Sequence, residues 1–255
     1  MKTKKILLAI AILAIAVVSC KKHSHDEDHD HGNSSLVIEF DHVWGTTLEQ
    51  FQLNKWFVHP MSKDSMKFTM LRYYVSNIKL KKTDGNWYEI PESYYLVDAS
   101  INKGNELQIN DIPDGDYTNI KFTMGVDSIR NVSGVQTGAL APSNGMFWDW
   151  NTGYIMIKAE GESPQSADGT FAFHLGGFSG EFNVVRELSM DFKGAILSIK
   201  KDASPVIHLL VNPARFRHTL GSLSNGSTKV HMPGASAKTM ADDFNTWIRF
   251  DHIHN

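Results

Sequence analysis

Cysteine is almost absent from the sequence, and this absence sets the first limits on its fold and chemistry. Cys20 is the only cysteine among 255 residues. An intramolecular disulfide, a zinc site made of thiolates and an iron–sulfur cluster are therefore excluded, because each needs more than one cysteine. The fold must be stabilised by its hydrophobic core, which the 42% hydrophobic content can supply.

Long apolar runs are missing as well. The longest extends from Ile6 to Val18, behind a lysine-rich start, and its roughly 13 residues fall short of the roughly 20 that a membrane-spanning helix needs. The pattern predicts a cleaved lipoprotein signal peptide over residues 1–19. Residues 17–20 resemble the bacterial lipobox, which implies that Cys20 receives a lipid and becomes the mature N-terminus. We therefore expect a lipid-anchored protein of the cell envelope, at the periplasmic or surface face of an outer membrane.

Positive charge and the common catalytic motifs are also scarce. The predicted signal peptide holds three of the 25 Lys and Arg residues and none of the 28 Asp and Glu residues, so the mature chain has a formal net charge of −6. A nucleic-acid partner is not expected at this charge. The sequence contains no Gly-x-Ser-x-Gly elbow, His-Glu-x-x-His pair, phosphate loop or dinucleotide fingerprint. We expect a binding protein rather than an enzyme.

Residues 20–35 form a polar segment that we predict to be a disordered tether, since almost nothing in it could anchor to a core. Four histidines stand among its acidic residues: His23, His25, His29 and His31. Imidazoles and carboxylates on a flexible chain could collect Zn²⁺, Cu²⁺ or Ni²⁺ loosely. A solvated linker without metal is the alternative, and the sequence does not decide between the two.

Residues 36–255 predict one all-β domain, a β-sandwich with a long irregular loop and a short C-terminal helix. Apolar residues recur with a period of two, as half-buried strands require. The expected strands cover residues 36–42, 66–82, 87–90, 94–97, 118–124, 154–160, 170–175, 182–192, 195–200 and 205–211. Met240, Phe244 and Trp247 have the spacing of one helix face, and residues 125–154 predict the long loop.

Histidine supplies the candidate chemistry of the domain. His42 ends a strand on the same face as apolar residues and therefore needs a polar partner. His174 is expected on the face opposite Phe171, Phe173 and Leu175, with room beside it. His252 and His254 stand two residues apart, so an extended segment points them the same way, with Asp251 available to orient one of them. His231 adds an imidazole beside the thioether of Met232. Each histidine taken alone is more often a hydrogen-bonded or surface residue than a ligand.

Trp148 and Trp150 form the aromatic element of the sequence, within residues 145–154. Two indoles at i and i+2 share a face if the segment is extended. An indole N–H only donates, so both side chains read first as packing residues and not as metal ligands. Chemical modification of either ring would change that interpretation.

Several segments together resemble the MbnP-like copper-binding proteins, in the bacterial lipoprotein branch of that family. The matching segments are residues 71–80, 95–98, 122–128, 137–140, 145–154 and 173–176. The resemblance implies a β-sandwich that binds copper outside the cytoplasm and accompanies a diheme cytochrome c peroxidase-like protein. It also implies that His174 is a ligand and that His42, His231, His252 and His254 are further candidates. In some relatives a tryptophan is oxidised to kynurenine, and by position Trp148 or Trp150 is the candidate for that change.

Three hypotheses follow for function. The first is copper capture or handover, with His174 as the principal ligand and His42, His252 and His254 completing the site. The second is a surface module that recognises a glycan or a protein through Trp148 and Trp150. The third is a redox partner whose tryptophans relay electrons to a heme protein.

Overall fold

The computed structural model describes residues 34–148 and 153–255 of the chain. The predicted signal peptide, Cys20, the four tether histidines and Trp150 lie outside the described residues. No helix within these two ranges is long and apolar enough to cross a membrane.

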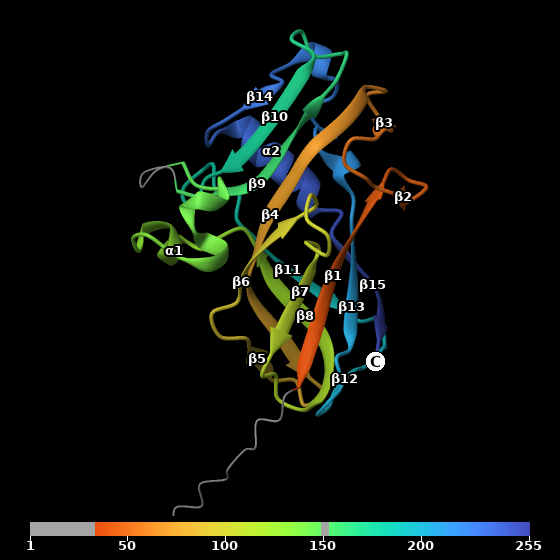
Figure 1. Ribbon diagram of the computed structural model, residues 1–255, viewed down its shortest axis with the longest axis vertical. Coiled ribbons are helices and arrows are strands. Elements are labelled where there is room, and N and C mark those ends of the chain that lie inside the picture. Colours follow the sequence, from red (N-terminus) through yellow and green to blue (C-terminus); the bar gives the residue numbers. More distant parts are fainter. Residues whose placement is uncertain (1–33, 149–152) are drawn as a thin grey trace, which may run out of the picture. The chain divides into compact units, whose positions relative to one another are not determined.

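The described strands form two sheets, as the sequence predicts for a sandwich (Figure 1). The smaller sheet contains β1 (Ser35–Trp44), β2 (Glu49–Gln50), β7 (Glu106–Asn110), β13 (Val206–Val211) and β15 (Arg249–His254). The larger sheet contains β3 (Trp56–Val58), β4 (Ser65–Lys82), β5 (Trp87–Glu89), β6 (Tyr94–Asp98), β8 (Gly115–Met124), β9 (Ile155–Glu162), β10 (Thr170–Gly176), β11 (Arg186–Asp191), β12 (Leu197–Ile199) and β14 (Lys229–Val230). The all-β prediction is confirmed.

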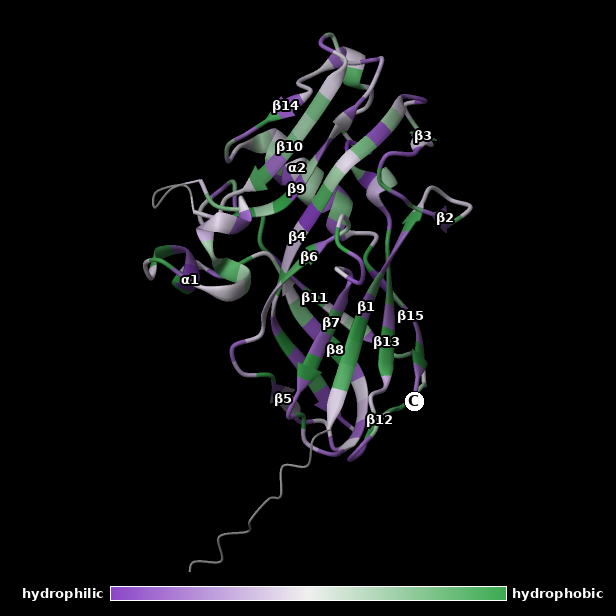
Figure 2. Cartoon of the chain, viewed as in Figure 1, coloured by the Kyte–Doolittle hydropathy of each residue, from purple (hydrophilic) through white to green (hydrophobic). Residues whose placement is uncertain are grey.

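Strand β4 organises the larger sheet. The first half of its 18 residues pairs with β9 and the second half with β8. Shorter stretches of β4 also pair with β3, β5 and β6. Buried and partly exposed residues alternate on both sides of a buried stretch over residues 73–76, and the alternation of hydrophobic and hydrophilic residues can be followed in Figure 2. The predicted strand over residues 66–82 is therefore one continuous element.

The core lies between the two sheets. Phe40 of β1 packs edge-on against Tyr73 of β4 at 5.8 Å and against Phe122 of β8 at 5.9 Å, measured between ring centroids. Helix α2 (Ala235–Asn245) covers a further part of the larger sheet, where Phe244 contacts Tyr73 and stacks on Phe216. These aromatic contacts tie the helix and both sheets into one hydrophobic core.

The helix and one strand differ most from the sequence-based expectation, and the strands β2, β3, β7 and β14 were not expected at all. The predicted helix exists, but it begins at Ala235, ends at Asn245 and is followed by β15, so the chain ends on a strand. The apolar residues with helical spacing extend to Ile248, beyond the end of the helix, because Ile248 is also buried. The strand predicted over residues 182–192 starts only at Arg186.

The predicted loop over residues 125–154 contains short helices that periodicity did not reveal. These are α1 (Ser128–Val132) and the 3-10 turns Gly138–Leu140 and Pro142–Asn144. Asp127 caps α1 by accepting a hydrogen bond from the backbone N–H of Arg130. Five residues are too few for an amphipathic pattern, so the caps and not the periodicity were the available signal.

Candidate metal centre

His174 and His231 are brought together by strand pairing. Strand β10 runs parallel to β14 with Ala172 opposite Lys229 and Phe173 opposite Val230, so the next step of the register places His231 beside His174. Their Nδ1 atoms lie 3.0 Å apart. Strand alternation buries Phe171, Phe173 and Leu175, which leaves His174 on the opposite face as predicted.

Glu160 fixes the orientation of the His174 ring. This residue lies on the neighbouring strand β9, and its Oε1 is 2.7 Å from Nε2 of His174. A ring whose Nε2–H donates to a carboxylate presents an unprotonated Nδ1, which is the nitrogen that faces His231. Burial alone would raise the pKa of Glu160, but the hydrogen bond from His174 and the nearby Lys158 outweigh it and lower that pKa.

The His174 imidazole is held in its neutral form. Burial lowers its pKa, and the charge of Lys158 and the neighbouring His231 act in the same direction, against the opposing effect of Glu160. The side chain of His174 is 15% exposed, whereas His231 is exposed to solvent. Neutral imidazoles are the form that binds a transition metal, so His174 can act as a ligand near neutral pH.

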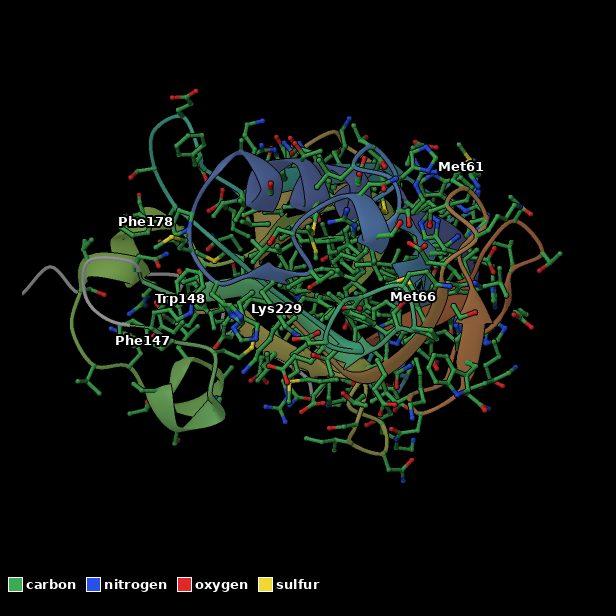
Figure 3. The ribbon with its side chains drawn as sticks, turned by 90° about the horizontal axis from the view of Figure 1, so that it is seen from above. Met61, Met66, Phe147, Trp148, Phe178 and Lys229 are labelled. Atoms are coloured by element: carbon green, nitrogen blue, oxygen red, sulfur yellow. The ribbon has the colours of Figure 1, made fainter. Side chains whose placement is uncertain are left out.

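The described parts of the aromatic segment, residues 145–148 and 153–154, lie next to the pair of histidines. The ring of Trp148 covers Gly176, two residues along β10 from His174, and a Cβ at Gly176 would come within 2.5 Å of that ring. The backbone N–H of Trp148 donates to the carbonyl of Gly153 at 3.1 Å. Phe147 packs edge-on against Tyr154. Figure 3 shows Phe147 and Trp148 on the same side of the domain as Phe178, far from Met61 and Met66.

Asn131 fixes the backbone of the aromatic segment at Tyr154, although sequence reasoning did not single it out. Its buried side chain accepts a hydrogen bond from the Tyr154 N–H and donates to the carbonyls of Val126 and Asp127. Lys158 fixes the beginning of the segment by donating to the carbonyl of Gly145. In a single sequence, Asn131 is not distinguishable from any other asparagine of the predicted loop, although it lies in α1, so no sequence signal marked it.

His42 lies in a different environment. Its Nε2 is 3.0 Å from the hydroxyl of Tyr73, and its ring packs against Tyr73 and Phe51. The polar partner that the sequence required is therefore a tyrosine of the core. His42 belongs to neither of the groups of three metal-ligating side chains that occur among the described residues.

Burial gives His42 a predictable effect on acid stability. Its pKa is lowered to about 4, below the value near 6.5 expected in an unfolded chain. The unfolded state therefore takes up a proton first, and stability present above pH 6.5 is lost as the pH falls towards 4, by roughly 3 kcal/mol. The free energies of unfolding of the wild type and His42→Gln can be measured with a denaturant at several pH values. Plotted against pH, they should give curves that diverge between pH 6.5 and 4. Parallel curves would show that His42 is not responsible.

His252 and His254 form a separate group with His208. The structure confirms that His252 and His254 point the same way, with their Nε2 atoms 3.1 Å apart, and that Asp251 contacts Nδ1 of His252 at 2.8 Å. This group lies on the smaller sheet, whereas His174 and His231 lie on the larger one, and Figure 1 shows β10 and the C-terminal end of β15 at opposite ends of the domain. The predicted ligands thus fall into two groups, with His42 in neither.

Comparison with known proteins agrees with this fold. The family model described as MbnP matches residues 33–232. Among solved structures, MbnP from Methylosinus trichosporium is similar with a TM-score of 0.53 and 14% sequence identity, covering 80% of this chain and 83% of that chain, a likeness that establishes the fold. No protein with a curated description matches the sequence. Because the family model spans most of the described domain, the chain belongs to the MbnP family, which is associated with copper.

Proposed function

We propose that this protein is a lipid-anchored copper-binding protein of the cell envelope, and that His174 and His231 are its copper ligands. The single observation that carries the proposal is the pair of imidazole nitrogens 3.0 Å apart. Ring nitrogens that share one transition-metal ion lie about 3 to 4 Å apart, because each metal–nitrogen bond is about 2 Å long. The pair therefore needs little rearrangement to hold an ion.

The surroundings of the pair suit copper. Glu160 orients His174 in the way that carboxylates orient metal-bound histidines. Met232 follows His231 directly and is 68% exposed, so its thioether is available to a soft ion such as Cu(I). At a nitrogen site, affinity also favours Cu²⁺ over the other divalent first-row metals.

The aromatic segment would complete the site. Kynurenine, formed by oxidation of a tryptophan, carries an aryl amine and a ketone, both better donors than indole. Trp148 or Trp150 is the candidate for this change, since Trp148 lies over the strand that carries His174. A diheme cytochrome c peroxidase-like protein is the proposed oxidising partner, and copper capture or handover without catalysis is the proposed role.

Metal analysis tests the proposal. We expect residues 34–255, purified without the tether and equilibrated with copper and zinc together, to retain copper that the His231→Ala variant releases. The same samples, taken from cells that contain the partner, should show the mass of kynurenine in the peptide that carries Trp148 and Trp150. No copper held by the His174–His231 pair would contradict the proposal, and an unmodified peptide would contradict its kynurenine component alone.

Recognition of a protein partner is a second candidate function. The loop around α1 exposes three apolar side chains, Ile129 at 73%, Val132 at 66% and Val135 at 71%. Exposed apolar residues gathered on one loop are typical of interaction surfaces. Trp148 is partly covered, so the described part of the aromatic segment offers less of a platform than the sequence indicated. A domain that retains no copper would favour this candidate.

A further inference from the structure

The second histidine group stands on the solvent-facing side of the smaller sheet. Strand β13 runs parallel to β1 and antiparallel to β15, so His208 is paired with Glu39 on one side and with His252 on the other. The opposite side of β13 is buried through Ile207, Leu209 and Val211. Alternation along β13 therefore directs His208 away from the core.

A β-bulge brings β15 into line with this arrangement. His208 is opposite His252, but the next residue, Leu209, is opposite Phe250, so Asp251 is the extra residue. Without the bulge, Phe250 and His252 would share a face, since they are two residues apart. With it, Phe250 is buried while His252 and His254 are exposed beside His208. The irregularity thus aims two imidazoles at a third.

The three rings are in direct contact. His208 and His252 stack with centroids 4.2 Å apart and an angle of 4° between their planes, and the centroid of His254 lies 4.9 Å from that of His208. One ring nitrogen from each of the three lies within 4.8 Å of the others. Imidazoles are polar, and the side chain of His252 remains 46% exposed, so apolar packing alone does not explain the cluster.

Carboxylates orient two of the three rings from outside. Asp41 Oδ2 lies 2.8 Å from Nδ1 of His208, and Asp251 Oδ2 lies 2.8 Å from Nδ1 of His252. Nε2 of each ring therefore keeps a lone pair free of the carboxylate. Because an ion binds in the plane of an imidazole, the parallel rings of His208 and His252 must tilt toward each other to share one ion. A carboxylate on the outer nitrogen is the arrangement that metal-bound histidines usually have. Glu39, 3.7 Å from His208, adds a further negative charge that favours a cation.

We propose that His208, His252 and His254 form a second metal site, separate from the His174–His231 pair, for a borderline divalent transition ion such as Zn²⁺ or Cu²⁺. Three imidazoles suit these ions, whereas Ca²⁺ and Mg²⁺ require oxygen ligands. The side chain of His252 is 46% exposed, so the site opens to solvent. Three protein ligands with an open position leave the bound ion able to exchange or to accept a ligand from another molecule.

Zinc binding by single-site variants tests this proposal. The parent is the full chain with His174→Ala, and with the four tether histidines each replaced by Asn, so that neither the first site nor the tether contributes. We expect it to bind one equivalent of Zn²⁺, and the dissociation constant, measured by competition with a chromophoric chelator, to rise at least about 100-fold in His208→Ala. Asp41→Asn, which removes a positioning carboxylate, should raise it about 10-fold to 100-fold.

The controls separate metal binding from folding. His254 is exposed next to the C-terminus, so His254→Ala should weaken Zn²⁺ binding while the thermal unfolding of the metal-free protein stays unchanged. His42→Gln, a histidine outside both groups, should leave the dissociation constant as in the parent. A parent that binds no Zn²⁺, or binding that His208→Ala and His254→Ala leave unaffected, would overturn the second site. Neither result bears on copper at His174 and His231.

Discussion

Replacing His174 by alanine should lower the copper affinity of the His174–His231 pair by at least about 100-fold. His174 is the ring that Glu160 orients and burial keeps neutral, so its loss removes the better-prepared of the two nitrogens. Changes to outer partners of a metal ligand alone cost about 10-fold to 100-fold, and loss of a ligand itself costs more. Competition for Cu(I) with a chelator of known affinity measures the effect, on residues 34–255 with His208→Ala so that the second histidine group does not contribute.

Two variants make this result specific. Glu160→Gln keeps the size of the side chain and removes its charge, so it should weaken copper binding by about 10-fold while His174 remains present. His252→Ala removes a histidine from the other group and should leave copper at the His174–His231 pair unchanged. If His174→Ala binds copper as tightly as the wild type, the assignment of His174 as a ligand is wrong.

Replacing Arg217 by methionine should destabilise the domain by about 3 to 5 kcal/mol. Arg217 is 3% exposed, and its guanidinium donates to three backbone carbonyls, those of Gly221, Ser222 and Ser227. Hydrogen bonds from a charged group are worth about 1.5–3 kcal/mol each, and carbonyls left buried without a donor cost more than ones returned to water. Equilibrium unfolding in urea measures the loss.

Arg217→Met should also weaken copper binding. The segment that Arg217 holds, residues 221–227, leads directly into β14 and His231. Arg217→Lys, which keeps the charge but not the fork of donors, should recover only part of the stability. Lys103→Met is the matched control, since Lys103 is 71% exposed and its pair with Glu106 should be worth less than about 1 kcal/mol. Equal losses in Arg217→Met and Lys103→Met would contradict the role given to Arg217.

The period of apolar residues along single segments predicts where most strands lie and on which side of its strand a residue stands. Alternation placed His174 opposite the buried Phe171, Phe173 and Leu175, and the spacing of His252 and His254 predicted that their rings point the same way. Both inferences need only the period of two, which is a property of one strand. The nearby Asp251 could be identified for the same reason.

Long-range pairing was beyond these patterns. His231 lies beside His174 only because β10 and β14 run parallel, although 57 residues separate the two histidines in sequence. His208 stands within an apolar strand and has no motif around it, yet alternation with Ile207 and Leu209 places it on the side away from the core. The bulge at Asp251 depends on the partner strand and has no signature in β15 alone.

The pairing of β1 with β13 has a consequence for how the chain acquires its structure. Strand β1 opens the domain, but one of its neighbours, β13, comes more than 160 residues later, with Val37 opposite Val206. A chain that emerges with its N-terminus first must leave that edge of β1 unsatisfied until almost all of the domain has appeared. Completion of the smaller sheet is therefore a late, post-synthetic event, and truncation shortly before β13 should yield an aggregation-prone fragment instead of a shorter domain.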